Sequence, residues 1–259
     1  MQAGQRARNV FVVLWVAVTA LKAIVAARLP LFVDEAFYWQ EGQHLAAAYS
    51  DLPGLTAWMT RLGVELAGHH ALGVRLPFLV MGAALPWMVA RLSTRWFGAR
   101  FGWQAGSLTV LMPLSATLGI LAVPDVPMAF AAVLCLDAGA RLLRGVDAGS
   151  ALMLASGLLL GALSHYRFIG VIGVGFIALL LLPEGRVWMA LTVGIVAWLP
   201  LLAWNLDNQD AGLKFQLVER HPWAFQISGL WFLAIQPLLV TPLLCLAMWQ
   251  AGAAGIRPA

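Results

Sequence analysis

The chain has 259 residues, of which 61% are hydrophobic and only 11% are charged. A soluble domain carries about 25% charged residues, so this composition excludes an ordinary soluble protein and predicts a polytopic membrane protein. The formal net charge of +4 comes from scattered arginines and lysines without a basic run. That pattern argues against a nucleic-acid partner and is typical of loops that orient a membrane protein.

Apolar segments of roughly 16–24 residues recur along the chain, close to the length that crosses a bilayer. They predict an all-α fold with about eight transmembrane helices in one module over residues 1–259. An even number of spans puts both termini on one side, and the basic, acid-free segment 93–102 marks that side as cytoplasmic. The predicted spans are 9–29, 74–92, 103–122, 126–143, 151–166, 168–183, 186–204 and 226–249.

Two polar segments are expected on the outer, periplasmic side: a first outer loop at 30–73 and a last outer loop at 205–225. In the first loop, Pro30 ends the first span and Asp34 is placed to cap a short helix that runs to about Ala48. Residues 50–54, Ser-Asp-Leu-Pro-Gly, have the composition of a turn.

A second short helix is predicted after that turn. Arg61 and Glu65 are spaced to pair on its polar face. An amphipathic helix that carries tryptophan on its apolar side, next to a span, is typical of the membrane interface. Its predicted apolar face consists of Leu55, Trp58, Met59, Leu62 and Leu66.

Three other features of the sequence have structural interpretations. Lys22 lies inside the first span and is expected to extend outward to the interface. Asp137 and Arg141 are spaced for an ion pair within one helix. The dipeptide 69–70, His-His, lacks further ligands at metal spacing, so a loop role is favoured over zinc.

The outer face is also expected to collect residues suited to group transfer. The 123–127 turn places Asp125 between two spans, and residues 164–167 interrupt a long apolar run. A carboxylate can accept a proton from a hydroxyl nucleophile, and cations stabilise the charge that develops on a phosphate leaving group. Simpler interpretations stay open: Asp34 as a helix cap, Asp125 as a turn residue, and Arg167 as an interfacial arginine.

Residues 34–63, DEAFYWQEGQHLAAAYSDLPGLTAWMTRLG, resemble the first outer loop of membrane glycosyltransferases of the C-type fold. The resemblance is to the bacterial branch related to protein O-mannosyltransferases and to the lipid A aminoarabinose and galacturonic acid transferases. Three later stretches agree in the same order: PDVP at 124–127, SHYRF at 164–168, and WNLDN at 204–208 followed by Phe-Gln at 215–216.

This resemblance implies an inverting transfer of a sugar from a polyprenyl-phosphate donor to a glycolipid, such as lipid A or lipopolysaccharide, or to a protein. It implies that the reaction occurs at the periplasmic face of a bacterial inner membrane. Asp34 would be the catalytic base, Glu35 would share or support that role, and Asp125 would be the second acidic residue. Some relatives use a divalent metal ion, for which Asp34 and Asp125 would be the ligands.

The same resemblance places further residues near the substrates. His165 stands where the family usually has lysine, and Gly54 stands where it has a second proline. The residues expected near the donor phosphate are His165, Tyr166, Arg167 and Lys214. Those expected to face the acceptor or the membrane lipids are Tyr38, Tyr49, Asp51 and Trp58.

The length of the chain keeps an alternative function open. Relatives usually continue with further spans and often with an outer domain. Three interpretations stay open: a minimal enzyme, one half of a complex whose partner subunit supplies that part, or an inactive remnant. The alternative is a non-catalytic protein: a flippase for the lipid carrier or an assembly partner of a larger glycosyltransferase. Clustering of Asp34, Asp125 and His165 around one cavity would favour the enzyme, and wide separation would favour the partner.

Overall fold

The computed structural model describes residues 2–142, 144–145, 147–181, 195–196, 198–219, 227 and 229–255. Every regular element in these residues is a helix, and β pairing among them is limited to an isolated bridge between Ala48 and Pro53. The predicted all-α class is therefore confirmed for the described part of the chain. The helices are α1 (Gln2–Arg28), α2 (Val33–Glu41), α3 (Leu55–Ala67), α4 (Ala71–Phe97), α5 (Ala99–Leu111), α6 (Pro113–Thr117), α7 (Asp125–Leu142), α8 (Ala148–Ser164), η1 (Tyr166–Phe168), α9 (Ile169–Leu181), α11 (Leu199–Asp207), α12 (Ala211–Lys214), η2 (Phe215–Glu219), α13 (Gly229–Val240) and α14 (Pro242–Gly255).

Fewer helices than predicted are long and apolar enough to cross a bilayer. Among the described residues they are α1 and α4, with 27 residues each, and a third if α13 and α14 form one broken span. The predicted span 226–249 corresponds to α13 and α14, which meet at an angle of 101°. Thr241 at the break has a φ of +71°, a left-handed conformation that does not continue a helix. The eight-span prediction is not confirmed.

The middle spans differ from the prediction in continuity and length. The predicted span 103–122 is divided into α5 and α6, because Pro113 begins a new short helix after an extended Met112. Helices α7, α8 and α9 correspond to the spans predicted at 126–143, 151–166 and 168–183. Most of the span predicted at 186–204 lies outside the described residues.

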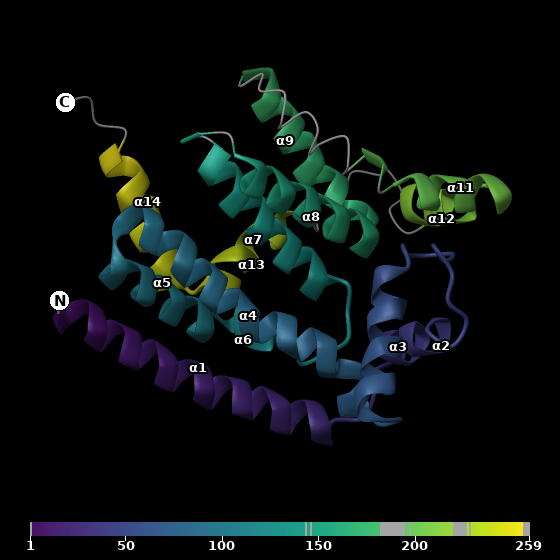
Figure 1. Ribbon diagram of the computed structural model, residues 1–259, viewed down its shortest axis with the longest axis horizontal. Coiled ribbons are helices and arrows are strands. Elements are labelled where there is room, and N and C mark those ends of the chain that lie inside the picture. The colour runs from purple at the N-terminus through teal and green to yellow at the C-terminus, as the bar shows by residue number, and fades with distance from the viewer. Residues whose placement is uncertain are drawn as a thin grey trace.

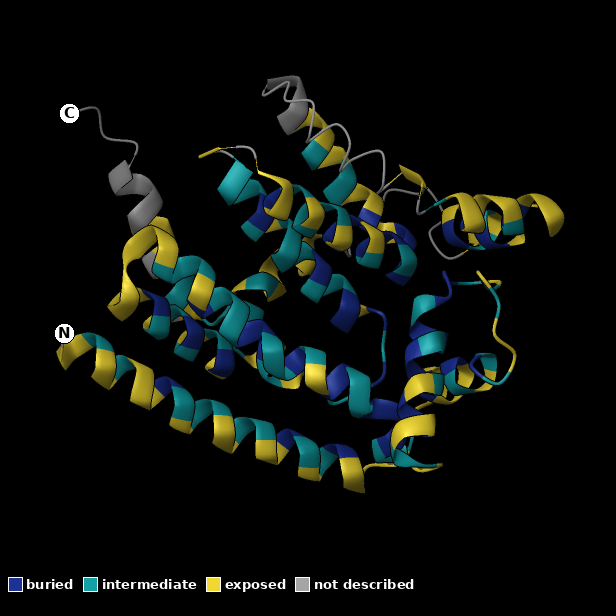
Figure 2. Ribbon diagram, viewed as in Figure 1, coloured by how far each residue is buried: buried dark blue, intermediate teal, exposed yellow. Residues whose placement is uncertain are grey.

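Helix α1 runs along one side of the molecule and contacts α4, α5 and α6, while α7 packs against both α4 and α8 (Figure 1). Buried residues lie where the helices meet, and the outward side of α1 is largely exposed (Figure 2). Phe11 is fully buried between the rings of Trp87 and Trp103, at centroid distances of 4.8 and 5.2 Å. This aromatic contact joins α1, α4 and α5.

Lys22 does not extend outward as predicted. Its side chain is buried, and its Nζ donates to the carbonyl oxygens of Ser115 and Leu118 at 2.9 Å each. Carbonyls at a helix C-terminus lack partners within the helix, and α6 ends inside the bundle. Lys22 therefore links α1 to α6. The prediction was wrong because the packing of α6 against α1, which brings these carbonyls to Lys22 from 93 and 96 residues away, is a tertiary feature.

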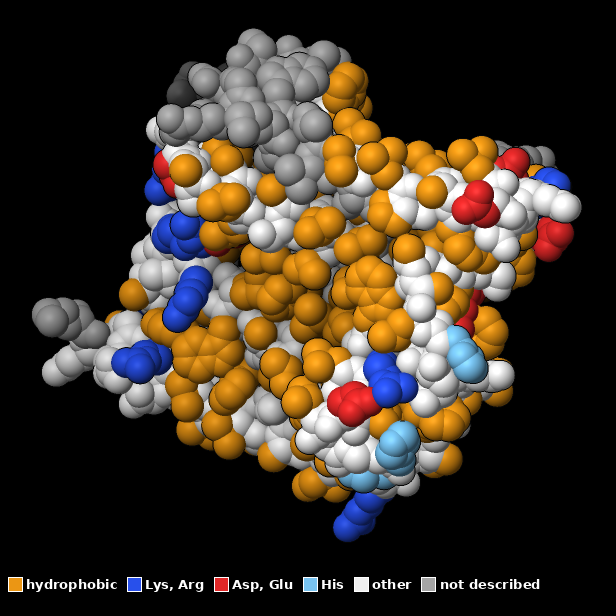
Figure 3. Space-filling view, turned by 45° about the vertical axis from the view of Figure 1, so that its right-hand side comes forward, with side chains coloured by type: hydrophobic (Ala, Val, Ile, Leu, Met, Phe, Trp, Pro, Cys, Tyr) orange, Lys and Arg blue, Asp and Glu red, His pale blue; other side chains and the backbone are white. Residues whose placement is uncertain are grey.

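The predicted ion pair between Asp137 and Arg141 is confirmed, with 3.3 Å between Oδ2 and Nη2. Arg95 of α4 contacts the same carboxylate, so the pair extends into a link between α4 and α7. Lys and Arg side chains gather at the left-hand edge of Figure 3, beyond a broad hydrophobic surface.

Helices α3 and α4 approach each other through glycine. A Cβ at Gly63 would lie 2.2 Å from the carbonyl oxygen of Gly73 and 2.7 Å from Cδ of Pro77. The connection is short because His70 caps α4: its Nδ1 accepts a hydrogen bond from Gly73 N at 3.0 Å. This confirms the loop role predicted for the two histidines.

Replacement of Gly63 by alanine is expected to destabilise the fold by about 1–3 kcal/mol, because the added methyl meets backbone that cannot move away. Gly139→Ala in α7 is the matched control, because a Cβ there has nothing within 4 Å. Thermal unfolding in detergent, followed by circular dichroism, measures both variants. Equal melting temperatures for the two variants would contradict the proposed close contact.

Candidate active site

The candidate site begins at α2, which starts one residue earlier than the predicted cap. Phe32 is the N-cap residue. Its N–H, which has no partner within the helix, donates to Glu35 Oε2 at 3.0 Å. Asp34 lies in the first turn of α2 with its side chain exposed. The interpretation of Asp34 as the helix cap was wrong, because Glu35 accepts the capping hydrogen bond instead.

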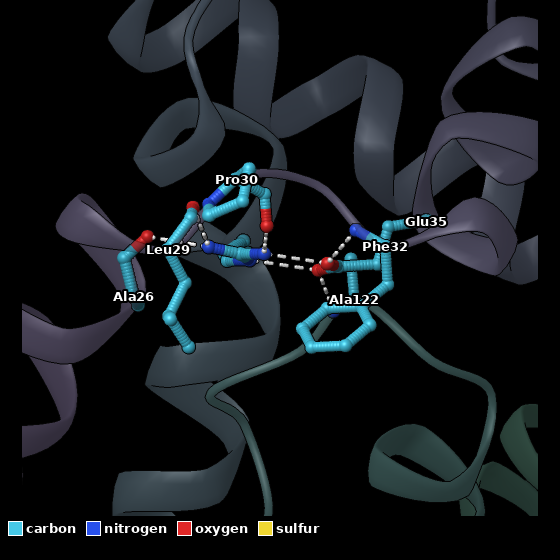
Figure 4. Close-up of polar contacts among 7 residues, drawn as sticks. Ala26, Leu29, Pro30, Phe32, Glu35 and Ala122 are labelled. Carbon is cyan, nitrogen blue, oxygen red and sulfur yellow. Dashed lines mark hydrogen bonds and ion pairs between the residues drawn. The ribbon is translucent and has the colours of Figure 1, made fainter.

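Glu35 and Arg75 form a buried ion pair with no solvent exposure on either side chain. Arg75 Nη2 lies 2.5 Å from Glu35 Oε2, and Arg75 Nε lies 2.7 Å from Oε1. This is the two-pronged geometry that suits a guanidinium and a carboxylate. Ala122 N donates a further hydrogen bond to Oε1 at 2.8 Å (Figure 4).

The remaining donors of Arg75 bind the chain that leaves α1. Nη1 donates to the carbonyl oxygens of Ala26 and Leu29, and Nη2 donates to that of Pro30, at 2.7 to 2.9 Å (Figure 4). The polar atoms of both side chains have hydrogen-bond partners. The pair therefore fixes four parts of the chain relative to one another: the end of α1, the start of α2, helix α4 and the segment at Ala122.

Burial alone would raise the pKa of the Glu35 carboxyl. The hydrogen bonds from Arg75, Ala122 and Phe32, together with the charge of Arg75, outweigh that effect and lower the pKa below its ordinary value. Glu35 is therefore an ionised, fully bonded carboxylate without access to solvent, and its geometry supports a positioning role.

Asp125 is the first residue of α7 and is exposed. It lies within the predicted turn at 123–127, which the hydrogen bond from Val126 N to the Val123 carbonyl closes at 3.3 Å. The bond between Ala122 and Glu35 brings this turn to the start of α2, so the segments that carry Asp34 and Asp125 adjoin. Within the described residues, no group of three or more His, Cys, Asp or Glu side chains is arranged to hold a metal ion.

Helix α2 ends at Glu41, well before the predicted end at Ala48. A Cβ at Gly42 would lie 2.8 Å from the Ala57 carbonyl oxygen, so glycine permits the close approach of α3. The following loop is closed by the predicted turn, in which Tyr49 N donates to the Leu52 carbonyl at 2.9 Å.

Three residues expected to face the acceptor or the lipids have contacts within this loop. Tyr38 is buried at 8% exposure. The Tyr49 hydroxyl accepts from Ala46 N at 3.0 Å, and Trp58 Nε1 donates to the Ala46 carbonyl at 2.8 Å. On α3, the predicted apolar face is divided: Leu62 and Leu66 are exposed, whereas Met59 is buried in the core. Arg61 pairs with Glu65 at 2.5 Å as predicted.

Asp51, the fourth such residue, lines a cavity of 590 Å³ between the first outer loop and the segment at 208–219. Phe37 also lines it and lies one helical turn after Asp34 on the exposed side of α2. Lys214 contributes a positive charge from the opposite wall. The principal lining residues are Phe37, Ser50, Asp51, Asn208, Lys214 and Glu219.

The hairpin at 164–168 and the later segment both dock on the first outer loop. Tyr166 is buried against Ala48 and Leu201, and its hydroxyl accepts from Asn205 Nδ2 at 3.3 Å. Gln216 Nε2 donates to the Asp51 carbonyl at 2.7 Å. The later stretches that resembled the glycosyltransferases are thus brought together with the first, although residues 220–225 of the predicted last loop lie outside the described residues.

His165 is buried at 3% exposure, and its Nδ1 accepts a hydrogen bond from Arg167 N at 3.1 Å. An accepting Nδ1 is unprotonated, so this geometry fits a neutral imidazole rather than the expected cation. The Arg167 side chain is exposed, as is that of Lys214. Of the four residues expected near the donor phosphate, Arg167 and Lys214 are therefore the exposed cations.

Residues 51–204, more than half of the chain, match the family described as dolichyl-phosphate-mannose-protein mannosyltransferase. The chain belongs to this family. It is 32% identical over 231 residues to the lipid A galacturonosyltransferase RgtD of Rhizobium johnstonii, a match that covers 85% of this chain and 48% of RgtD. The family resemblance predicted from the outer loops is thereby confirmed.

The fold of this mannosyltransferase-family chain is similar to the crystal structure of ArnT from Cupriavidus metallidurans in the apo state. The TM-score is 0.66 at 20% identity, over 95% of this chain and 51% of the ArnT chain. The chain therefore spans about half the length of the relatives that it matches.

Two residues of this family member were missed by sequence reasoning: Arg75 and Glu41. Burial, followed by the charge and hydrogen bond of Asp51, raises the pKa of Glu41 from 4.5 to about 8. Glu41 thus holds a proton near neutral pH and shares it with Asp51. The pairing of Arg75 with Glu35 has no local signal, since these residues lie 40 positions apart and meet through helix packing. Glu41 and Asp51 both lie in the first outer loop, but their spacing of ten residues follows no helical or strand period.

Arg75→Met is expected to destabilise the fold by about 3–5 kcal/mol, because it leaves the Glu35 carboxylate buried without a counter-charge. The double variant Glu35→Leu/Arg75→Met should recover part of that loss, since it removes both charges. Unfolding in detergent measures all three proteins. A double variant that is less stable than Arg75→Met would show that the charge imbalance is not the cause.

The raised pKa of Glu41 predicts a pH dependence of stability. Between 4.5 and about 8 the folded chain retains a proton that the unfolded chain has released, so stability falls as pH rises through this window. Glu41→Gln keeps a hydrogen-bond donor for Asp51 and does not titrate. Its melting temperature should therefore fall less than that of the wild type from about pH 5 to about pH 9, whereas parallel curves would contradict the assignment.

Proposed function

We propose that this chain is the membrane module of a glycosyltransferase that moves a sugar from a polyprenyl-phosphate donor to an acceptor at the outer face of the membrane. Membership of the mannosyltransferase family supports the reaction class. The observation that carries the proposal is an exposed Asp34 held beside a buried, fully bonded Glu35, on the helix whose Phe37 lines the outer cavity.

The chemistry follows from the charges of these residues. Asp34 accepts the proton of the acceptor hydroxyl, and that oxygen attacks the anomeric carbon of the donor from the face opposite the phosphate. The bond between the anomeric carbon and the phosphate oxygen breaks, and polyprenyl phosphate leaves with the bonding electrons. The configuration at the anomeric carbon is inverted. Arg167 and Lys214 stabilise the negative charge on the departing phosphate, whose tail stays in the bilayer.

The environments of the other carboxyls support Asp34 as the base. Glu35 is ionised but inaccessible, and all its contacts are structural. Glu41 carries a proton near neutral pH. Asp125 is exposed on the adjoining turn, where it is suited to position the acceptor hydroxyl.

The acceptor is proposed to be a glycolipid of the lipid A type, with other glycolipids or a protein as the alternatives. The relative RgtD, named a lipid A galacturonosyltransferase, supports this choice. The proposed location is a bacterial inner membrane, with the α2–α3 end in the periplasm and the arginine-rich end in the cytoplasm.

Asp34→Asn is expected to reduce sugar transfer by about 100-fold or more, because the amide cannot accept the hydroxyl proton. Glu65→Gln is the control, since Glu65 is an exposed acid on α3 away from the cavity lining. The assay uses liposomes that contain the full chain, a panel of polyprenyl-phosphate sugars and lipid A, with products identified by mass spectrometry.

Sugar transfer by Asp34→Asn at the wild-type rate would show that Asp34 is not the catalytic base. If the wild type binds or translocates the donor lipid without forming product, and Asp34→Asn does the same, the non-catalytic carrier function replaces the proposal. Melting temperatures of both variants, measured in parallel, separate loss of activity from loss of fold.

A further inference from the structure

A second cavity, of 830 Å³, lies between the N-terminal part of α1 and the length of α5. Both helices begin at the end of the molecule opposite α2 and α3 (Figure 1). Its walls come from one face of each helix. On α1 they include Gln2, Arg6 and Val10, and on α5 they include Arg100, Gln104 and Leu108. Successive members of each set are four residues apart, so each set forms a continuous stripe along its helix.

The two helices begin side by side and run in the same direction. A Cβ at Gly4 would lie 3.7 Å from Cβ of Ala99, so the start of α1 touches the start of α5. Both stripes therefore change from polar to apolar along the same direction. Because α1 is a candidate membrane span, the polar mouth of the groove lies at a membrane surface and its apolar end reaches into the hydrocarbon.

The polar end of the groove between α1 and α5 is positively charged. Arg6 and Arg100 are exposed, and neither forms an ion pair with any residue that the structure describes. No acid is among the lining residues, and Gln2 and Gln104 add amide donors. Guanidinium groups match the oxygens of a phosphate, and basic clefts between membrane helices suit anionic lipid headgroups.

We propose that this groove binds one anionic glycerophospholipid. The phosphodiester lies between Arg6 and Arg100, and an acyl chain follows Val10 and Leu108 into the bilayer. The apolar half of the groove favours a lipid over a free anion, because inorganic phosphate would leave these side chains uncovered. The site is independent of the outer cavity and of the proposed sugar transfer.

Native mass spectrometry of the full chain in detergent tests the proposal by titration with dioleoylphosphatidylglycerol or dioleoylphosphatidylcholine. The expected result for the wild type is one tightly held phosphatidylglycerol and weaker retention of phosphatidylcholine. Arg6→Gln/Arg100→Gln should weaken phosphatidylglycerol binding about 25-fold, because each of the two arginines near a lipid phosphate contributes roughly a factor of five.

The matched control is Arg8→Gln/Arg91→Gln, which removes the same charge from exposed positions outside the groove and should leave binding unchanged. Leu108→Gln keeps both arginines and should also weaken binding, because it disturbs the acyl-chain half. Circular dichroism of each variant verifies the fold, and the comparison of the two lipids on the wild type needs no variant.

Several outcomes would overturn the proposal. Equal retention of the two lipids by the wild type would show that the groove does not select negative charge. An equal loss in the control pair would assign the effect to overall charge. Displacement of phosphatidylglycerol by inorganic phosphate, with no effect of Leu108→Gln, would identify a simple anion site instead of a lipid site.

Discussion

The ion pair between Glu35 and Arg75 is the interaction on which the α2–α3 end of the molecule depends. Two charges without solvent exposure are costly to bury, and they are stable here because both side chains also bind backbone groups. Those backbone groups belong to three separate parts of the chain: the end of α1, the start of α2 and the segment before α7. Arg75 itself comes from a fourth part, α4. One pair of side chains therefore sets how the outer loops meet the membrane helices.

The direction in which the Glu35 side chain points determines where the side chain of Asp34 points. Successive residues on a helix point about 100° apart, so a Glu35 that enters the protein leaves Asp34 on the exposed side of α2. The surroundings of the carboxyl groups in this region then give them different protonation states. Glu35 is held ionised by Arg75, and Glu41 is held protonated by burial beside Asp51. Such separation of similar groups by their surroundings is how one site provides both a base and a proton-bearing carboxyl.

The two ends of the molecule differ in a way that suits a protein of the mannosyltransferase family. One end has acids, aromatic residues and a cavity that two outer segments enclose. The other end has arginines and a groove that runs from polar to apolar along α1 and α5. Helix α1 connects these ends. A fold similar to that of ArnT at 20% identity shows that the fold tolerates wide substitution, since packing needs volume and polarity more than particular residues.

The helical class, the family, the turn at 50–54 and the pairing of Asp137 with Arg141 could all be predicted from the sequence. The family follows from four stretches in a fixed order, and the other three follow from composition or from neighbours within one helical turn or one short loop. Only the tertiary structure decided that Glu35 faces Arg75, 40 residues away, and that Lys22 binds carbonyls of α6, 93 residues away. It also decided which acids are exposed. Such partners meet through helix packing, and periodicity along the chain carries no information about which helix a side chain will face.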